Sequence, residues 1–218
     1  MSLLSFDIGI KNLAYCVLCE KTQKIQDWGI INISCENQCQ HKTNKGDRCE
    51  KSATKTNGTL ELCTGHSKLK QYSSLTFKTM KSKNNLHSVG KKMVKAFDEK
   101  KIFQSCHTIL VENQPSLKNP TMKSIQMMVY TYFLIKNKPD TLEMINARNK
   151  LKVYHGPPIS TPYDKKKDTY KKNKYLAVLY CESMIQNEMS FFQNLYKTSK
   201  KKDDLSDCYL QAIYYLEK

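Results

Sequence analysis

The chain has 218 residues, of which 39% are hydrophobic and 10% aromatic, and these values predict a globular protein with a buried core rather than a disordered or fibrous one. Thirty-six basic residues against twenty acidic ones give a formal net charge of +16, which favours a polyanionic partner such as nucleic acid or an anionic membrane surface. No apolar run reaches the ~18 residues of a membrane-spanning helix. The first residues lack the basic segment of a secretory signal, so we expect an intracellular protein that is not secreted.

The first part of the chain predicts three strands and an insertion. Short apolar runs at residues 3–10, 13–19 and 25–33 are separated by turn residues and predict an antiparallel meander. Residues 35–75 are polar, rich in Lys, Thr and Asn, and poor in aliphatic residues. We therefore expect residues 35–75 to form a small inserted domain, and residues 1–34 and 76–218 to form the main domain.

The second part of the chain alternates helical and strand patterns. Apolar residues at helical spacing predict helices over 84–104, over 119–137 with an Asn119 cap, from Leu176 onward, and over 203–216. Short apolar runs predict strands at 107–112 and 151–155, and a charged linker spans 164–174. This order of elements predicts an α/β fold that mixes antiparallel and parallel strands.

Acidic residues recur at strand ends and at the start of the last helix. Asp7 lies in an apolar strand, where an ionised carboxylate is costly without a partner, and Glu112 closes another apolar run. Asp203, Asp204 and Asp207 open the last helix, and residues three or four apart share one helix face. Capping requires only one or two acids there. Clustered carboxylates repel unless divalent cations lie between them, and oxygen ligands favour Mg²⁺ or Mn²⁺.

The residues around these acids resemble a known family. Ser5–Ala14 (SFDIGIKNLA), Val111–Pro115 (VENQP) and Lys202–Cys208 (KDDLSDC) are similar, in this order, to the motifs of the poxvirus-type Holliday junction resolvases, in the RuvC-like branch of the RNase H-like superfamily. The stretch from Lys118 to Tyr132 adds to the resemblance, which covers roughly residues 3–33 and 84–217. It implies an RNase H-like mixed sheet of five strands flanked by helices.

The resemblance also implies a site and a reaction. Two metal ions, Mg²⁺ or Mn²⁺, would be bound by Asp7, Glu112, Asp204 and Asp207, with Asp203 as an adjacent candidate that spacing does not exclude. The implied activity is paired, symmetric phosphodiester hydrolysis in a four-way DNA junction, which leaves 5′-phosphate and 3′-hydroxyl ends. One ion would generate the nucleophile and the other would stabilise the leaving oxygen. Lys202 is the first candidate for stabilising charge in the transition state.

The polar insertion carries a pattern of metal ligands. The spacing Cys39-x9-Cys49-x13-Cys63-x2-His66 offers four ligands suited to tetrahedral zinc. A structural zinc ion would supply stability that a segment with few aliphatic residues lacks. The first ligand is the least certain, because Cys35 or His41 could replace Cys39. The other cysteines lie among apolar residues and are expected to be packing thiols: Cys16, Cys19, Cys106, Cys181 and Cys208.

The expected partners are branched DNA and a second copy of the chain. Seven lysines are candidate DNA contacts: Lys118, Lys123, Lys165, Lys166, Lys167, Lys171 and Lys172. Two symmetric incisions require two active sites, which predicts a homodimer, with Met127, Tyr130 and Phe133 as a candidate interface. The resemblance would suit a large DNA virus that acts in the host cytoplasm or at viral replication sites.

Two other functions stay open on the sequence. One is an RNase H-like nuclease that acts on RNA–DNA hybrids or replication flaps. The other is a non-catalytic, zinc-stapled DNA-binding module whose acidic residues are structural. The sequence does not distinguish the three, because substrate choice depends on the shape of the surface.

Overall fold

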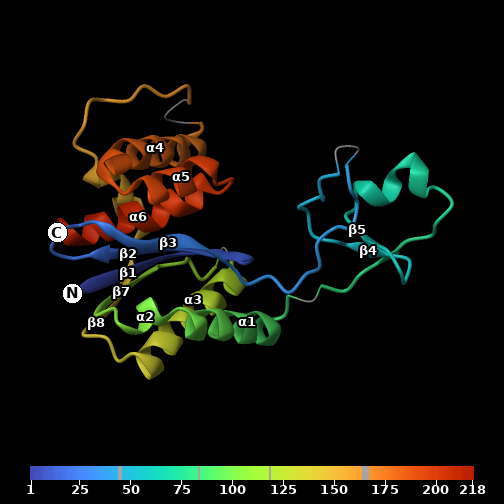
Figure 1. Cartoon of the computed structure of the whole chain (residues 1–218), viewed down its shortest axis with the longest axis horizontal. Coiled ribbons are helices and arrows are strands. Elements are labelled where there is room, and N and C mark those ends of the chain that lie inside the picture. Colours follow the sequence, from blue (N-terminus) through green and yellow to red (C-terminus); the bar gives the residue numbers. More distant parts are fainter. Residues whose placement is uncertain (44–45, 83, 118, 164–166) are drawn as a thin grey trace. The chain divides into compact units, whose positions relative to one another are not determined.

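The structure is a computed structural model that describes residues 1–43, 46–82, 84–117, 119–163 and 167–218. The chain divides into two compact units, one formed by Met1–Ile33 with Met93–Lys218 and the other by Ser34–Lys92 (Figure 1). Within the described ranges, no helix combines the length and the apolar character needed to cross a membrane.

A mixed five-stranded sheet lies at the centre of the first unit. Its strands are β1 (Ser2–Ile8), β2 (Asn12–Cys19), β3 (Ile25–Asn32), β7 (Thr108–Glu112) and β8 (Thr141–Ile145), in the spatial order β3-β2-β1-β7-β8. The pairs β1/β2 and β2/β3 are antiparallel, whereas the pairs β1/β7 and β7/β8 are parallel. This sheet confirms the predicted fold class.

Helices cover both faces of this sheet (Figure 1). On one face lie α2 (Lys101–Gln104), α3 (Pro120–Lys136) and the C-terminal part of α1 (Leu86–Glu99). On the other face lie α4 (Thr169–Met184), α5 (Ser190–Thr198) and α6 (Lys202–Leu216). The sheet is therefore the middle layer of three, and each of its faces needs apolar side chains.

The two faces of β1 contribute to different cores. The ring of Phe6 lies 5.3–5.6 Å, centroid to centroid, from three other buried rings on the α3 side: Phe97, Phe103 and Phe133. On the α6 side, Trp28 stacks on Tyr196 at 5.4 Å and 10°. Because side chains alternate along a strand, Asp7 points to the face opposite Phe6, which is the α6 side.

The structure corrects the prediction of the last strand. We expected residues 151–155 to form it, but the strand that pairs with β7 is Thr141–Ile145, and Leu151–Val153 belong to the 3-10 helix η3 (Ala147–Val153). Val153 is buried because it packs against the helices of the α6 layer, and this explains its apolar character without a strand.

Two helical predictions also change. The helix expected over 84–104 is divided at Lys100, which leaves the helical conformation (φ −94°, ψ 84°) between α1 and α2. Helix α5, which the sequence analysis did not identify, packs Phe192 and Tyr196 into the core of the α6 layer.

The second unit has short elements. It contains β4 (Lys55–Thr56), β5 (Glu61–Leu62) and β6 (Lys78–Thr79) in the order β5-β4-β6, with 3-10 helices η1 (His66–Lys68) and η2 (Lys70–Tyr72). Its buried cluster is small and consists of Cys39, Leu62 and Cys63. The unit extends beyond the expected 35–75 boundary because β6 pairs with β4.

Candidate active site and metal centre

Two of the predicted acidic residues meet at neighbouring strand ends. The parallel register of β1 and β7 pairs Phe6 with Val111, so Asp7 and Glu112 follow at the same end of adjacent strands. Their carboxyl groups interact with each other at this end of the sheet. The pKa of Asp7 is raised well above its usual range, first by burial and then by the charge and hydrogen bond of Glu112. A proton or a cation is therefore needed between them.

A third carboxylate comes from α6. The side chain of Gln211 anchors this helix to β1, because its Nε2 donates to Ser5 Oγ at 2.9 Å and to the Phe6 carbonyl at 3.3 Å. Asp207 lies one turn before Gln211 on the same helix. Burial raises the pKa of Asp207 to about 6, and the charge of Glu112 adds to this effect. Among the described residues, its buried Oδ1 atom has no hydrogen-bond partner.

Lys150 is the cation of this cluster, and the sequence analysis did not identify it. It lies in η3, and its ammonium forms an ion pair with Asp207 in which both side chains are about 15% exposed. Burial alone would lower the pKa of Lys150, but the charges of Asp207, Glu112 and Asp7 outweigh this effect and raise it. One ammonium thus faces three carboxylates.

The other two acidic residues of α6 have different partners. Asp203 accepts a hydrogen bond from Lys174 at 2.5 Å, and Asp204 lies 3.5 Å from the ammonium of Lys201. Burial would raise the pKa of Asp203, but the hydrogen bond and charge of Lys174 lower it. The pKa of Asp204 is raised by burial and then by the charge of Asp203. Asp204 lies one turn before Asp207 on α6. Lys174 binds the carboxylate of Asp203 and not that of Asp204.

A chain of amides holds Glu112 in place. Its Oε2 atom accepts hydrogen bonds from Gln114 Nε2 at 2.5 Å and from the Ile8 backbone at 3.5 Å. The backbone of Gln114 in turn donates to Gln126 Oε1 at 2.8 Å. Gln126 is fully buried on α3 and also accepts from Lys123 at 3.2 Å. This network orients one oxygen of Glu112 toward β1.

The lysines that the sequence analysis proposed for catalysis or DNA contact have different surroundings in the structure. The ammonium of Lys202 lies 5.4 Å from the ring centroid of Tyr196, and Lys171 pairs with Asp168 at 3.1 Å. Lys167 is exposed and precedes α4, whereas Lys172 is half-buried within α4, which begins at Thr169 inside the linker expected over 164–174. Lys118, Lys165 and Lys166 lie outside the described residues.

The predicted zinc ligands converge in the second unit. Their ligand atoms all lie within 4.8 Å of one another: Cys39, Cys49, Cys63 and His66. The Cys63 backbone donates to Cys39 Sγ at 3.2 Å, and the His66 backbone donates to Cys63 Sγ at 3.5 Å. Burial would raise the pKa of Cys63, but the His66 backbone and the neighbouring thiols lower it. This environment favours a thiolate, which is the metal-binding form.

The two alternative first ligands have other partners. The backbone of Cys35 donates to Asn84 Oδ1 at 2.6 Å, and Cys35 is not a member of the four-ligand group. The ring of His41 is tilted against that of His66 with centroids 3.9 Å apart, and its Nδ1 atom lies 3.2 Å from the Tyr72 hydroxyl. Among the described residues, Cys39 is therefore the first member of the four-residue group that could hold a metal ion.

The candidate dimer patch on α3 is different from the predicted one. Phe133 is buried in the core, and Tyr130 is half-buried. The exposed apolar residues of this helix are Met127 (41% exposed), Leu134 (54%) and Ile135 (66%). They are seven and eight residues apart and therefore share one helix face.

Comparison with known proteins places the fold. No family model matches the chain. "Uncharacterized protein L451" of Acanthamoeba polyphaga mimivirus is 33% identical over 207 residues, which cover 84% of this chain and 49% of the relative. The chain thus spans about half the length of this curated relative.

Two solved structures resemble the chain at low sequence identity. Thermus thermophilus RuvC has a TM-score of 0.51 at 8% identity, with 98% of this chain and 92% of that one covered. The fowlpox virus resolvase, in complex with substrate Holliday junction DNA, has a TM-score of 0.49 at 14% identity, with 100% and 97% covered.

Proposed function

We propose that this chain, which has the RuvC-like fold, is a metal-dependent endonuclease that resolves four-way DNA junctions by paired symmetric cleavage. One observation carries the proposal. Asp7, Glu112 and Asp207 come from β1, β7 and α6, distant parts of the sequence, and form one carboxylate cluster. A purely structural role would not explain this cluster, because three partly buried acids with one lysine destabilise the fold.

The residues of this cluster fit a divalent cation. Asp7, Glu112 and Asp207 supply carboxylate oxygens, and Asp207 Oδ1 is buried without a partner among the described residues. Such oxygens are the ligands that Mg²⁺ and Mn²⁺ prefer. Asp204, one turn earlier on α6, is the fourth ligand that we assign. When two ions are bound, they supply Lewis acidity and neutralise charge at the scissile phosphate.

The remaining side chains position these ligands. Gln114 holds one oxygen of Glu112, and Gln211 fixes α6 against β1 so that Asp207 faces Asp7. Lys150 neutralises part of the carboxylate charge and is the lysine that we assign to stabilising charge on the phosphate, in place of Lys202. Asp203 is bound by Lys174 and is a positioning residue in this proposal.

The substrate and assembly follow from charge and symmetry. A net charge of +16 favours DNA, and Lys123, Lys167, Lys171 and Lys172 remain candidate contacts together with the three lysines outside the described residues. Two symmetric incisions need two sites, and a two-fold dimer supplies them. We assign the interface to the exposed apolar face of α3 formed by Met127, Leu134 and Ile135.

The second metal site is structural in this proposal. Cys39, Cys49, Cys63 and His66 hold one Zn²⁺ ion, because three sulfurs and one imidazole are a typical zinc ligand set. Burial and the charge of His41 lower the pKa of His66, which keeps its imidazole neutral and able to bind metal. The ion would replace the missing core of a unit whose strands are two residues long.

The likeness to a mimivirus protein supports a viral origin, and we propose that the protein acts where viral DNA is replicated or processed. A role in processing viral DNA depends on the nuclease activity, so this activity is the property to test first.

Cleavage of synthetic substrates tests the proposal. The protein is incubated with Mg²⁺ and a labelled four-way junction, a linear duplex of the same arms, or an RNA–DNA hybrid. We expect paired cuts in the junction only, abolished by Asp7→Asn and by Glu112→Gln while junction binding persists. Hybrid cleavage would favour an RNase H-like function. Binding of all substrates without cleavage would favour a non-catalytic module.

Mixing experiments test the dimer. Wild-type chains mixed with excess Asp7→Asn chains should leave junctions nicked on one strand, because mixed dimers contain one active site. Sedimentation should show roughly twice the chain mass at micromolar concentration, since a two-fold dimer is expected. Paired cuts by a monomer that does not dimerise on the junction would contradict this assignment.

A further inference from the structure

The second unit has many more basic residues than acidic residues to pair with them. Residues 34–92 contain eleven lysines and one arginine against four acidic residues. Two of these four acids are engaged within the unit, because Glu61 accepts from Asn37 Nδ2 at 2.5 Å and Glu36 accepts from Ser82 Oγ at 3.1 Å. Such an excess, on a unit that supplies none of the candidate catalytic residues, favours a polyanionic partner.

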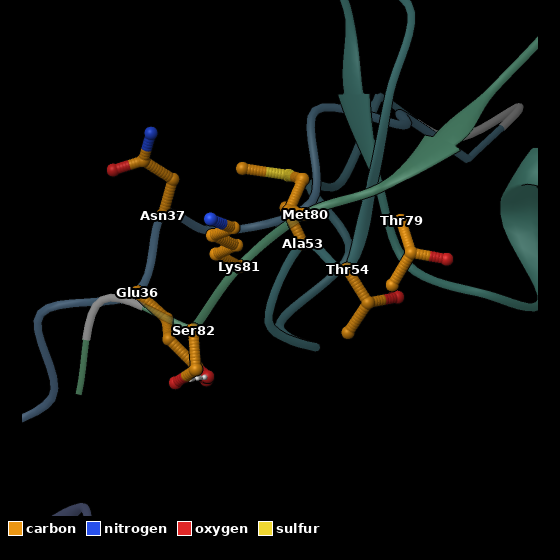
Figure 2. Close-up of a pocket in the computed structure, with 8 residues that line it drawn as sticks. All are labelled: Glu36, Asn37, Ala53, Thr54, Thr79, Met80, Lys81 and Ser82. Atoms are coloured by element: carbon orange, nitrogen blue, oxygen red, sulfur yellow. Dashed lines mark hydrogen bonds between the residues drawn. The ribbon is translucent and has the colours of Figure 1, made fainter. Parts of the chain in front are cut away.

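Part of this charge borders a groove of the unit. Figure 2 shows the groove, which has a volume of about 160 Å³ and runs beside β6. Three segments form its walls, one from each of residues 36–37, 53–54 and 79–82. Lys81 is a lining residue, and Lys78 lies three residues earlier on the edge strand β6. Among the described residues, Lys78 and Lys81 are exposed and have no ion-pair partner.

The chemistry of the lining suits a sugar–phosphate chain. Thr54, Thr79, Ser82, Asn37 and Lys81 line the groove. Glu36 also lines it, and its carboxylate accepts a hydrogen bond from the Ser82 hydroxyl. Hydroxyl, amide and ammonium groups are the side-chain types that contact DNA phosphates and sugars. The side chain of Met80 adds an apolar contact. The Lys55 ammonium donates to Thr79 Oγ1 at 2.7 Å, so a third positive charge contacts a residue that lines the groove.

We propose that the unit formed by residues 34–92 is a second DNA-binding surface, which grips the phosphate backbone of a duplex arm through Lys78, Lys81 and the groove beside β6. The choice of DNA as the polyanion rests on the proposed nuclease function. The surface reads no sequence, because phosphate contacts fix register and strengthen binding without reporting base identity. Its role is to add affinity for an arm of the substrate.

Binding of the full chain to a fluorescent linear duplex, without Mg²⁺ and without chelator, tests the surface. The variant Lys78→Gln/Lys81→Gln should weaken binding by roughly tenfold at 0.1 M salt and reduce the salt slope by about two, since each lost phosphate contact removes ~0.9. The matched control is Lys42→Gln/Arg48→Gln, which removes the same charge from an exposed pair outside the groove lining. It should change the slope by less than half as much.

Two further measurements keep the outcome unambiguous. Lys78→Arg/Lys81→Arg retains the charge and should bind like the wild type, and all variants should contain the same zinc as the wild type. Equal loss in the groove pair and the control pair, or no loss in either, would overturn the proposal, as would loss of binding in the arginine pair. Absence of junction cleavage would refute the nuclease function and leave this comparison of duplex binding intact.

Discussion

Asp7→Asn should stabilise the metal-free protein while it abolishes cleavage. In the wild type, burial and the neighbouring Glu112 and Asp207 raise the pKa of Asp7, so its ionised form is unfavourable in the folded state. Asparagine has almost the same shape and carries no charge. The substitution therefore leaves two carboxylates facing the Lys150 ammonium instead of three, and it removes one of the proposed metal ligands.

The magnitude follows from the neighbouring carboxylate. The pKa of Asp207 rises from 3.8 to about 6, and such a shift corresponds to ~3 kcal/mol of unfavourable ionisation. The pKa of Asp7 is raised in the same direction, and we expect Asp7→Asn to raise the free energy of unfolding by about 2 kcal/mol at pH 8, the upper end of what a single stabilising substitution contributes. For a unit of this size, this gain corresponds to an increase in Tm of roughly 4–8 °C.

The sign of the pH dependence is part of the prediction. A raised folded-state pKa means that protonated Asp7 stabilises the fold below its unfolded pKa of 3.8, and that this stability is lost as pH rises through the higher folded-state pKa. Wild type and Asp7→Asn should therefore be almost equally stable near pH 4. Their difference should grow as the pH is raised above that value.

Trp28 provides the assay. It is the only tryptophan of the chain, it is 1% exposed, and it stacks on Tyr196, so its fluorescence follows unfolding of the first unit. Thermal and urea unfolding are measured without divalent cations at several pH values. The control is Asp140→Asn, the same substitution at an exposed carboxylate of the first unit, which should change stability by less than about 0.5 kcal/mol.

Two results would refute this reasoning. One is an Asp7→Asn variant that is less stable than the wild type at pH 8 without metal, because the carboxylate would then be a stabilising group. The other concerns Mg²⁺, which should stabilise the wild type by ~2.7 kcal/mol at a hundred times its Kd and the variant by much less. Equal stabilisation of both would remove Asp7 from the metal site.

Three further predictions concern the other charged and metal-binding residues. Cys63→Ser should lose the bound zinc, measured by metal analysis, and unfold the second unit while the Trp28 transition persists; an unchanged zinc content would exclude Cys63 as a ligand. Lys150→Met should reduce the cleavage rate by about 10²–10³-fold with junction affinity nearly unchanged, and a rate close to wild type would return Lys202 to consideration. Asp204→Asn should reduce the cleavage rate more severely than Asp203→Asn, whose carboxylate is held by Lys174, and the reverse order in single-turnover assays would exchange the two roles.

The fold class and most acidic candidates could be predicted from sequence because they depend on short-range patterns. Short apolar runs over 3–10 and 13–19 specify two strands, since each strand buries side chains on both faces of the sheet. Asp7 and Glu112 stand out because an acid is unusual in an apolar run. The four zinc-type ligands stand out because their spacing is local to one insertion.

Only the tertiary structure distinguishes segments and residues whose local sequence patterns are alike. Residues 141–145 and 151–155 are both short and partly apolar, and only pairing with β7 selects the first as a strand. Lys150 is one of thirty-four lysines, and nothing near it in the sequence marks it as the one that pairs with Asp207. The pair forms because η3 packs against α6. Adjacent acids at 203 and 204 differ only in their partners on other elements. Long-range charge contacts depend on how helices pack on the sheet, and no periodicity along the chain encodes them.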